Sequence, residues 1–509
     1  MRFRYIFHIT LLFLLFTGSI LLRDRNIDKP LGRHHEWITA HTLVTLSIWE
    51  KEGLITHHFS PIYTFSGKAN ANLELLGGVK DQNGRCYYTS YPPFAFLLPY
   101  FIFHPLGITP NVMSLQVLGL IIHFICAFGV FLLLYQLYGK HIGKETFLPA
   151  FIAFTLYCYS YGNLWFHMNL WFCDILMQAF FIYGTLLYCK IRRGTGTRIH
   201  HILLGLVAFL AVYTEWLGLL MVMVFAISEG IRALRKKTNY RLFIVLCGAA
   251  FLALTLTLWQ YSSINGLSAF LEAAKAKYLI RSGYQNRSIS EYGFNILNPA
   301  SYEKMDGNYN GNYLTLINLL GILGILFIAI SIYRRKYFMN QEEGSLLFYI
   351  ILPVVLHHLI FFNFNIVHDF STLKTVFFLI TLLAIFSQRI LLFFSSLPVK
   401  VSWIGSVGLT IIISIKCFES AVLYKKNYVA NSIIPPYVVL GQAIRTQAPA
   451  DVLVIINGEL CPEMMYYSGR NMGWALDTTG ARDFLSRGGY SKAIFFDIKN
   501  GVLKGVYPL

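Results

Sequence analysis

Charged residues are scarce in this sequence of 509 residues: they make up 13% of it, whereas 56% of the residues are hydrophobic. A soluble globular domain carries about 25% charged residues, so an ordinary water-exposed surface is excluded for most of the chain. Apolar runs at 6–22, 242–261 and 313–333 approach or reach the roughly 20 residues that a helix needs to cross a bilayer. The composition therefore predicts a polytopic membrane protein whose first partner is the lipid bilayer.

Cysteine patterns that bind metal are missing as well. The eight cysteines show no CxxC or related ligand spacing. Six of them lie in or beside apolar runs: Cys126, Cys158, Cys173, Cys189, Cys247 and Cys417. Cys86 and Cys461 fall in segments expected on the outer side and could pair, but two free thiols are the favoured interpretation.

Acidic residues are outnumbered by basic ones, 25 to 42, which leaves a formal net charge of +17. These basic residues form short clusters between apolar runs, as the positive-inside rule predicts, and no basic-aromatic nucleic-acid motif occurs. We therefore expect no nucleic-acid partner. No internal repeat is evident either, which disfavours a repeat-built transporter.

A signal-peptide cleavage site is also lacking. The chain begins Met-Arg-Phe-Arg before its first apolar run, no small-x-small site follows, and Arg23-Asp24-Arg25 comes directly after. This pattern predicts an uncleaved first span in the cell inner (plasma) membrane, with the N-terminus in the cytoplasm.

The segment after Tyr91-Pro92-Pro93 decides the topology. If 94–103 crosses the membrane, the basic clusters at 190–198 and 232–241 fall outside. If it stays at the interface, every basic loop lies inside and the short outer loops contain no Lys or Arg. We therefore predict about eleven transmembrane helices and a Tyr-Pro-Pro segment that does not cross.

This topology divides the chain into six parts, three of which lie outside the membrane. In the C-terminal part, 452–456 and 493–496 read as strands, and 437–447 and 479–487 as helices, which predicts a small α/β domain. The parts are 1–22, the first transmembrane helix; 23–111, an outer loop with interfacial helices; 112–262, transmembrane helices 2–7; 263–312, a second outer loop; 313–419, transmembrane helices 8–11; and 420–509, the extracytoplasmic α/β domain.

Glu36 begins a segment of the first outer loop, 37–49, whose apolar spacing is typical of a helix lying on the membrane surface. The carboxylate either stabilises the first turn of that helix or acts as a general base where a soluble acceptor meets a lipid-borne donor. His34 and His35 could add metal ligands, but adjacent side chains on a helix diverge. No metal site is assigned, and a divalent metal stays a possible cofactor.

Further ionisable residues lie near the outer ends of other spans. Asp174, Glu215 and the pair His368-Asp369 are expected on the same side as Glu36. Because charge within a membrane is costly and usually functional, these residues form either a shared site or a set of interfacial charges. His357 and His358 are expected to pack inside the bundle.

The second outer loop contains a basic amphipathic stretch at 269–279, followed by Arg281 and Arg287. Such a stretch suits an anionic headgroup surface, and arginine suits bidentate contact with a specific lipid phosphate. Tyr91 and its neighbouring tyrosines suit the interfacial aromatic belt.

Together these features resemble the GT-C superfamily of polyprenyl-phosphate-sugar-dependent glycosyltransferases, in particular bacterial protein-mannosyltransferases and aminoarabinose transferases. The resemblance rests on matched positions along nearly the whole chain: Glu36 for the acidic position after the first span, Tyr91-Pro92-Pro93-Phe94, Asp174, Thr214-Glu215, His368-Asp369-Phe370 and Tyr466-Tyr467-Ser468-Gly469-Arg470. The chain departs from the family pattern at His35, where an Asp is usual, and at Glu215, where a Lys is usual.

The resemblance implies a GT-C-like helical fold and inverting transfer of a sugar from a polyprenyl-phosphate carrier to a glycan, lipid or protein acceptor. It implies catalytic roles for Glu36, as the base, and for Asp174 and His368. Substrate-binding roles follow for His35, Tyr91, Glu215, Arg281, Arg287 and Asp369. A transporter or flippase, a glycan polymerase or ligase of another fold, and a non-catalytic scaffold stay open as alternatives.

Overall fold

The computed structural model describes residues 2–71, 73, 78–139, 147–236, 240–283, 294–334, 339–429, 434–488 and 490–509. Eight of the described helices are long and apolar enough to cross a membrane. They are α4 (Val112–Tyr138), α7 (Cys173–Arg192), α9 (Trp216–Lys236), α10 (Arg241–Ser282), α11 (Pro299–Arg334), α12 (Gln341–Ile360), α14 (Leu373–Ser395) and α15 (Val399–Tyr428). Three further helices occupy the other three expected spans: α1 (Arg2–Leu21), α5 (Phe147–Tyr159) and α8 (Arg198–Val212).

Short elements fill the connections between these helices. The helical ones are α6 (Tyr161–Asn169) and α13 (Phe362–Val367), with 3-10 turns η1 (Asp24–Asn26), η2 (Ile55–His57), η3 (Lys68–Asn70) and η5 (Asp369–Thr372). Strands β1 (Val79–Lys80) and β2 (Cys86–Tyr87) form a small antiparallel ladder.

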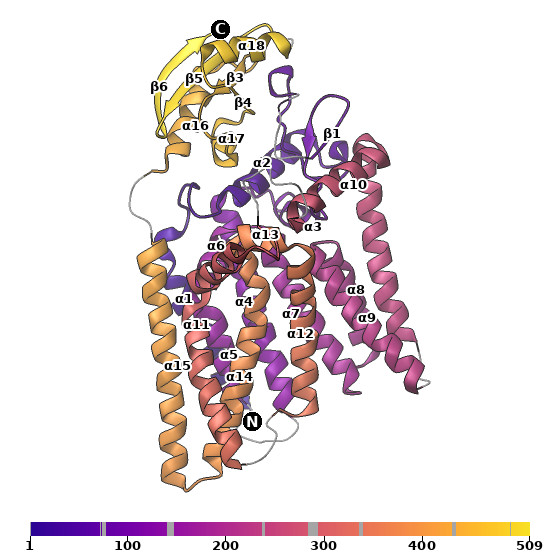
Figure 1. The fold of residues 1–509 in the computed structure, drawn as a ribbon, viewed down its shortest axis with the longest axis vertical. Helices are drawn as coiled ribbons and strands as arrows, with labels where there is room; N and C mark the ends of the chain where they lie inside the picture. The colour runs from indigo at the N-terminus through magenta and orange to yellow at the C-terminus, as the bar shows by residue number, and fades with distance from the viewer. Residues whose placement is uncertain are drawn as a thin grey trace.

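The Tyr-Pro-Pro segment leads into a helix that is too short to span a bilayer. α3 (Phe94–Phe103) has ten residues, which extend about 15 Å at 1.5 Å per residue, against about 30 Å of hydrocarbon. It begins directly after Pro93 and lies with α2 at one end of the long helices (Figure 1). This position agrees with the prediction that the segment does not cross.

Two of the long helices change direction at the same end of the bundle. α10 breaks at Asn265 and Gly266, where Gly266 has φ +85° and so needs the left-handed region open to glycine. α11 breaks at Tyr313. Beyond its break, α10 turns across the end of the bundle (Figure 1). The described part of the second outer loop is therefore largely helical.

Helix α2 (Trp37–Glu52) is more deeply enclosed than the sequence predicts. It is expected on the membrane surface, yet residues 38–46 are all buried. Its threonine face is hydrogen-bonded to neighbouring carbonyls: Thr39 Oγ1 donates to Asn169 O at 2.7 Å and Thr45 Oγ1 to Ile62 O at 3.1 Å. Protein therefore covers both the apolar and the threonine faces of this helix.

The C-terminal segment forms a mixed sheet of four strands in the order β4-β3-β5-β6. β4 and β5 run parallel to β3, and β6 is antiparallel to β5. The strands are β3 (Leu453–Ile456), β4 (Gly473–Trp474), β5 (Ala493–Lys499) and β6 (Val502–Pro508), and the helices are α16 (Pro436–Gln447), α17 (Pro462–Ser468) and α18 (Thr478–Arg487). This unit covers the end of the bundle that carries α2, opposite the N-terminus (Figure 1). Cys86 and Cys461 are free thiols.

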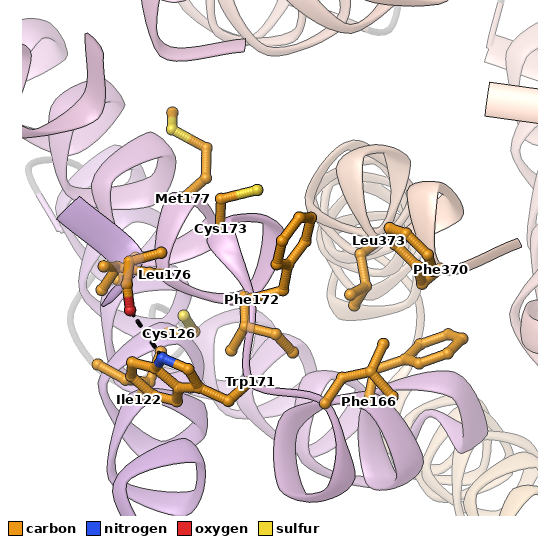
Figure 2. Close-up of a cluster of buried hydrophobic side chains, with 14 of the residues drawn as sticks. Ile122, Cys126, Phe166, Trp171, Phe172, Cys173, Leu176, Met177, Phe370 and Leu373 are labelled. Carbon is orange, nitrogen blue, oxygen red and sulfur yellow. Dashed lines mark hydrogen bonds between the residues drawn. The ribbon is translucent and has the colours of Figure 1, made fainter. Parts of the chain in front are cut away.

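An apolar core fixes the turn between α6 and α7. Figure 2 shows Trp171 and Phe172 in this turn, with Phe172 on the side of Phe370 and Leu373. The Phe172 and Phe370 rings meet edge-on at 6.3 Å, and Trp171 Nε1 donates a hydrogen bond to Ala95 O of α3 at 2.8 Å. The turn therefore packs α3 and α7 against η5, the short segment that leads into α14.

Candidate functional site

A cavity of about 610 Å³ lies between the end of the bundle and the C-terminal unit. Its wall combines four parts of the chain that are far apart in sequence. They are the first loop (Gly32, Arg33, His35, Trp37, His41 and Tyr88), the second half of α10 (Lys277, Ile280 and Arg281), the α13–α14 region with Phe172 (Asn363, Phe364, Val367, His368 and Phe370), and the C-terminal unit (Tyr437 and residues 459–463).

Arg281 is held in the cavity wall by aromatic rings and by the Tyr-Pro-Pro segment. Its guanidinium carbon lies 4.2 Å from the centre of the Tyr91 ring and 4.9 Å from that of Phe364, which are cation–π distances. Its Nη1 donates to Ser90 O at 3.1 Å. Lys277, four residues earlier, shares this helix face and also lines the cavity. Arg287, the second arginine predicted to bind substrate, lies outside the described residues.

The Tyr91 ring therefore packs against the Arg281 guanidinium and restricts its position. Its side chain is 2% exposed, and the Tyr261 hydroxyl donates to its carbonyl oxygen. The sequence predicts a tyrosine of the interfacial belt that binds substrate, and the structure gives its ring a definite partner, the Arg281 guanidinium. The sequence contains a signal for Lys277 as a second cation of this site. Lys277 and Arg281 are four residues apart in one helical stretch and so share a face of the helix.

Glu36 is buried beside the cavity. Its side chain is 4% exposed, and its Oε2 accepts hydrogen bonds from the backbone N–H groups of Gly32, at 3.0 Å, and Arg33, at 2.9 Å. Burial raises the pKa of its carboxyl to about 7. Among the described residues, the cavity wall includes His35 and Trp37 on either side of Glu36 but not Glu36 itself.

His35 and His368 both line the cavity, whereas Asp369 lies behind them. The His368 ring stacks on Phe370 with centroids 5.1 Å apart, which fixes its orientation. His35 Nε2 is 2.6 Å from Asp369 Oδ1, and His34 Nε2 is 2.8 Å from Oδ2. Burial lowers the pKa of the His35 imidazole. The structure thus places Asp369 against two imidazoles of the first loop.

Asp174 and Glu215 are brought together below the cavity rather than in its wall. Asp174 forms an ion pair with Lys374, and Lys374 Nζ lies 3.8 Å from Glu215 Oε1. His357 Nε2 is 3.1 Å from the same oxygen. All four side chains are at most 1% exposed. Asp174 and Glu215, two of the ionisable residues expected on one face, thus share the Lys374 ammonium, but among the described residues none of the four lines the cavity.

Lys374 was not predicted from the sequence as a partner of these carboxylates. The short outer loops contain no Lys or Arg that could balance Asp174 and Glu215. Lys374 does so from the first turn of α14. It lies in the apolar run 371–390, one of the eleven predicted transmembrane helices. A lone lysine in such a run is itself a signal, because an unpaired charge in the membrane is costly. His357, expected to pack by hydrogen bonding, does so with Glu215.

The C-terminal unit contributes two carboxylates, Glu459 and Glu463, to the cavity wall. The nearby Tyr-Tyr-x-Gly-Arg motif has an architectural role. The Leu31 N–H donates to the Tyr467 hydroxyl at 2.8 Å, and Arg470 Nη1 donates to Pro449 O at 2.7 Å. This motif therefore holds the unit on the first loop and so brings Glu463 to the cavity.

Glu463 is expected to make the stability of the protein depend on pH. Its side chain is 3% exposed, and burial raises its pKa to about 7. Because the pKa of this carboxyl is higher in the folded state, the group favours folding most strongly below its unfolded pKa of about 4.3. That stabilisation is lost as the pH rises through the folded-state pKa of about 7. Glu463→Gln removes the titrating carboxyl. The melting temperature of the variant minus that of the wild type should therefore increase from pH 5 to pH 8.

The expected gain at pH 8 is on the order of 3 kcal/mol, from 1.36 kcal/mol per pKa unit. Thermal unfolding in detergent at several pH values measures it. Glu459→Gln is the matched control, since that carboxylate lines the same cavity. A difference between Glu463→Gln and wild type that stays constant from pH 5 to pH 8 contradicts the prediction.

Solved structures show the same fold. The oligosaccharyltransferase AglB of Archaeoglobus fulgidus, in complex with an inhibitory peptide and a dolichol-phosphate, superimposes over 97% of this chain and 70% of its own with a TM-score of 0.58 and 12% identity. ArnT of Cupriavidus metallidurans, bound to undecaprenyl phosphate, covers 97% of this chain and 93% of its own with a TM-score of 0.58 and 10% identity. No family model and no curated sequence matches the chain. The chain therefore has the GT-C-like fold that its sequence pattern resembles.

Proposed function

We propose that this protein is an integral membrane glycosyltransferase that moves a sugar from a polyprenyl-phosphate carrier to an acceptor. The observation that carries the proposal is the cavity itself, whose wall includes Lys277 and Arg281 beside aromatic rings and, from the C-terminal unit, Glu459 and Glu463. The two cations suit an anionic phosphate, and the aromatic rings suit its apolar carrier. The hydroxyl groups of a sugar or acceptor match carboxylates, which accept hydrogen bonds. Both fold neighbours were solved with a polyprenyl phosphate.

The carrier phosphate is assigned to Lys277 and Arg281. Arginine offers several N–H donors to a phosphate, and lysine adds a point charge. The rings of Tyr91 and Phe364 restrict the Arg281 guanidinium, so little order is lost when phosphate binds. His368, fixed against Phe370, stands at the same wall and would stabilise the leaving phosphate.

Transfer would invert the anomeric centre. An acceptor hydroxyl attacks the anomeric carbon, the bond from that carbon to the phosphate oxygen breaks, and the phosphate leaves as an anion held by the cations. Glu36 is our choice for the base that takes the hydroxyl proton. It adjoins the lining residues His35 and Trp37 in the chain, and its carboxylate would have to leave the Gly32 and Arg33 amides to reach an acceptor in the cavity.

The reaction is assigned to the extracytoplasmic face of the plasma membrane. The N-terminus would be cytoplasmic, because basic residues begin the chain and fill the loops assigned to that side. Helix α2 and the C-terminal unit, which contribute to the cavity wall, lie at the end of the bundle opposite the N-terminus (Figure 1), and this arrangement supports an outer position for the cavity.

Lys277→Gln tests the donor site. Loss of one charge-assisted contact to phosphate is expected to weaken binding of the polyprenyl-phosphate sugar about 10-fold. The KM for donor, measured with purified enzyme in lipid nanodiscs, reports the change. Lys275→Gln is the matched control, since Lys275 is exposed on the same helix and is not part of the cavity wall as described. Equal KM values for both variants would count against the assignment.

A further inference from the structure

Three potential metal ligands converge at the cavity wall, which includes one of them, His35. One imidazole nitrogen each of His34 and His35 and one carboxylate oxygen of Asp369 lie within 4.8 Å of one another. Asp369 is 335 residues from His34 in the sequence, so the fold brings them together. Neighbouring residues on a regular helix would diverge, but His34 and His35 precede α2, and His35 has φ +60°. This left-handed backbone lets both imidazoles turn to the same carboxylate.

Each member of the cluster is held by groups outside it. Asn312 Nδ2 donates to the Asp369 carbonyl at 3.1 Å and to its Oδ2 at 3.3 Å. Trp165 Nε1 donates to the His34 carbonyl at 3.2 Å, and the Phe370 ring meets the His35 ring edge-on at 5.1 Å. A left-handed conformation is strained for a non-glycine residue and persists where the surroundings demand it. The cluster is therefore preorganised.

The contacts within the cluster differ from a simple hydrogen-bonded triad. Asp369 Oδ1 lies 2.6 Å from His35 Nε2, yet among the described residues it has no hydrogen-bond partner of acceptable geometry. Two imidazole nitrogens and a carboxylate are the borderline ligand set that zinc and similar divalent ions prefer. Ligand atoms about 2.0–2.2 Å from such an ion stand roughly 3.3 Å apart in a tetrahedron. The two histidine–carboxylate pairs, now 2.8 and 2.6 Å apart, would therefore have to open by roughly 0.5 to 0.7 Å.

We propose that His34, His35 and Asp369 bind one divalent transition-metal ion of the zinc class, with a fourth position open to water. His34 is 40% exposed and also lines a second cavity with Arg33, Trp165 and Tyr428, which gives the ion a path to the site. The ion would join the first loop to the start of α14. It would thereby fix His35, and with it the adjoining part of the main cavity wall. Glu36 is not a ligand in this arrangement.

Metal content of the full-length protein tests the proposal without any transfer assay. The protein is purified with a tag that contains no histidine, treated with chelator, loaded with Zn²⁺ and desalted before elemental analysis. We expect about one zinc per wild-type chain. Asp369→Asn and His34→Ala should each weaken zinc binding by at least ~100-fold, beyond the 10–100-fold typical of losing a supporting group. Co²⁺ loading should give the visible absorption of a tetrahedral ion in the wild type and not in these two variants.

His104→Ala is the matched control, because His104 forms an imidazole–carboxylate pair with Glu50 at 3.1 Å outside the cluster. It should retain wild-type zinc. The exposed His34 can be replaced without opening the core, so that variant is informative even if Asp369→Asn fails to fold. Equal zinc in the wild type and in His34→Ala, whether zero or one, overturns the site. Because binding is read directly, its failure is distinct from a failure of the proposed transfer reaction.

Discussion

Replacing Glu36 by glutamine is expected to lower the rate of sugar transfer at least 100-fold, because general bases contribute about 10²–10⁴ in rate. The substitution separates catalysis from architecture. Glu36 Oε2 now accepts the N–H groups of Gly32 and Arg33, and the amide oxygen of glutamine can accept the same two hydrogen bonds. The loop should keep its shape while the proton acceptor is lost. Product formation per folded enzyme, at saturating donor, measures the effect.

Glu50→Gln is the control for this experiment, since Glu50 lies at the other end of α2 and pairs with His104 near the surface. It should transfer sugar at the wild-type rate. If Glu36→Gln instead keeps most of its activity while its abundance is normal, Glu36 only holds the turn at Gly32 and Arg33. The base would then have to come from another group in the cavity wall.

Lys374→Met is expected to destabilise the protein by about 3–5 kcal/mol, the usual effect of removing one partner from a buried ion pair. Lys374 is the cation shared by Asp174 and Glu215. Without it, Glu215 keeps His357 as a partner, whereas Asp174 is left as a buried carboxylate with the weak Cys173 thiol donor at 3.6 Å. Thermal and denaturant unfolding of the purified protein in detergent measure the loss.

The double variant Asp174→Asn/Lys374→Met should recover part of this loss, because it removes the charge that Lys374→Met leaves unpaired. Lys425→Met, on an exposed position of α15, should change stability by less than about 0.5 kcal/mol. Equal stability of Lys374→Met and the wild type would show that water or another cation compensates Asp174.

Local features of the sequence predict the helices well. Apolar run length locates a helix at each of the eleven expected spans, and the prolines at 92 and 93 with the short run after them predict a short helix, which is α3 with ten residues. The strands at 453–456 and 493–499 follow from short apolar runs between turn residues. Each of these depends on residues within one segment, which is why composition and spacing suffice.

The contacts of α2 could not be predicted in the same way. Its apolar spacing is equally compatible with a lipid surface and with a protein interior, and only the positions of Asn169, Ile62 and the C-terminal unit decide that it is enclosed. The direction of the Glu36 carboxylate likewise depends on the turn at Gly32 and Arg33, whose backbone N–H groups it accepts.

The sequence by itself determined the class of protein, the helices and the set of ionisable residues near one end of the bundle, because hydrophobic length and the cost of charge in a membrane act on each segment separately. Only the tertiary structure decided the pairing. It places Lys374 on Asp174 across 200 residues, Asp369 on His34 and His35 across the chain, and Arg281 on Tyr91. Partners so distant in sequence meet through the packing of several helices at once, which no single segment specifies.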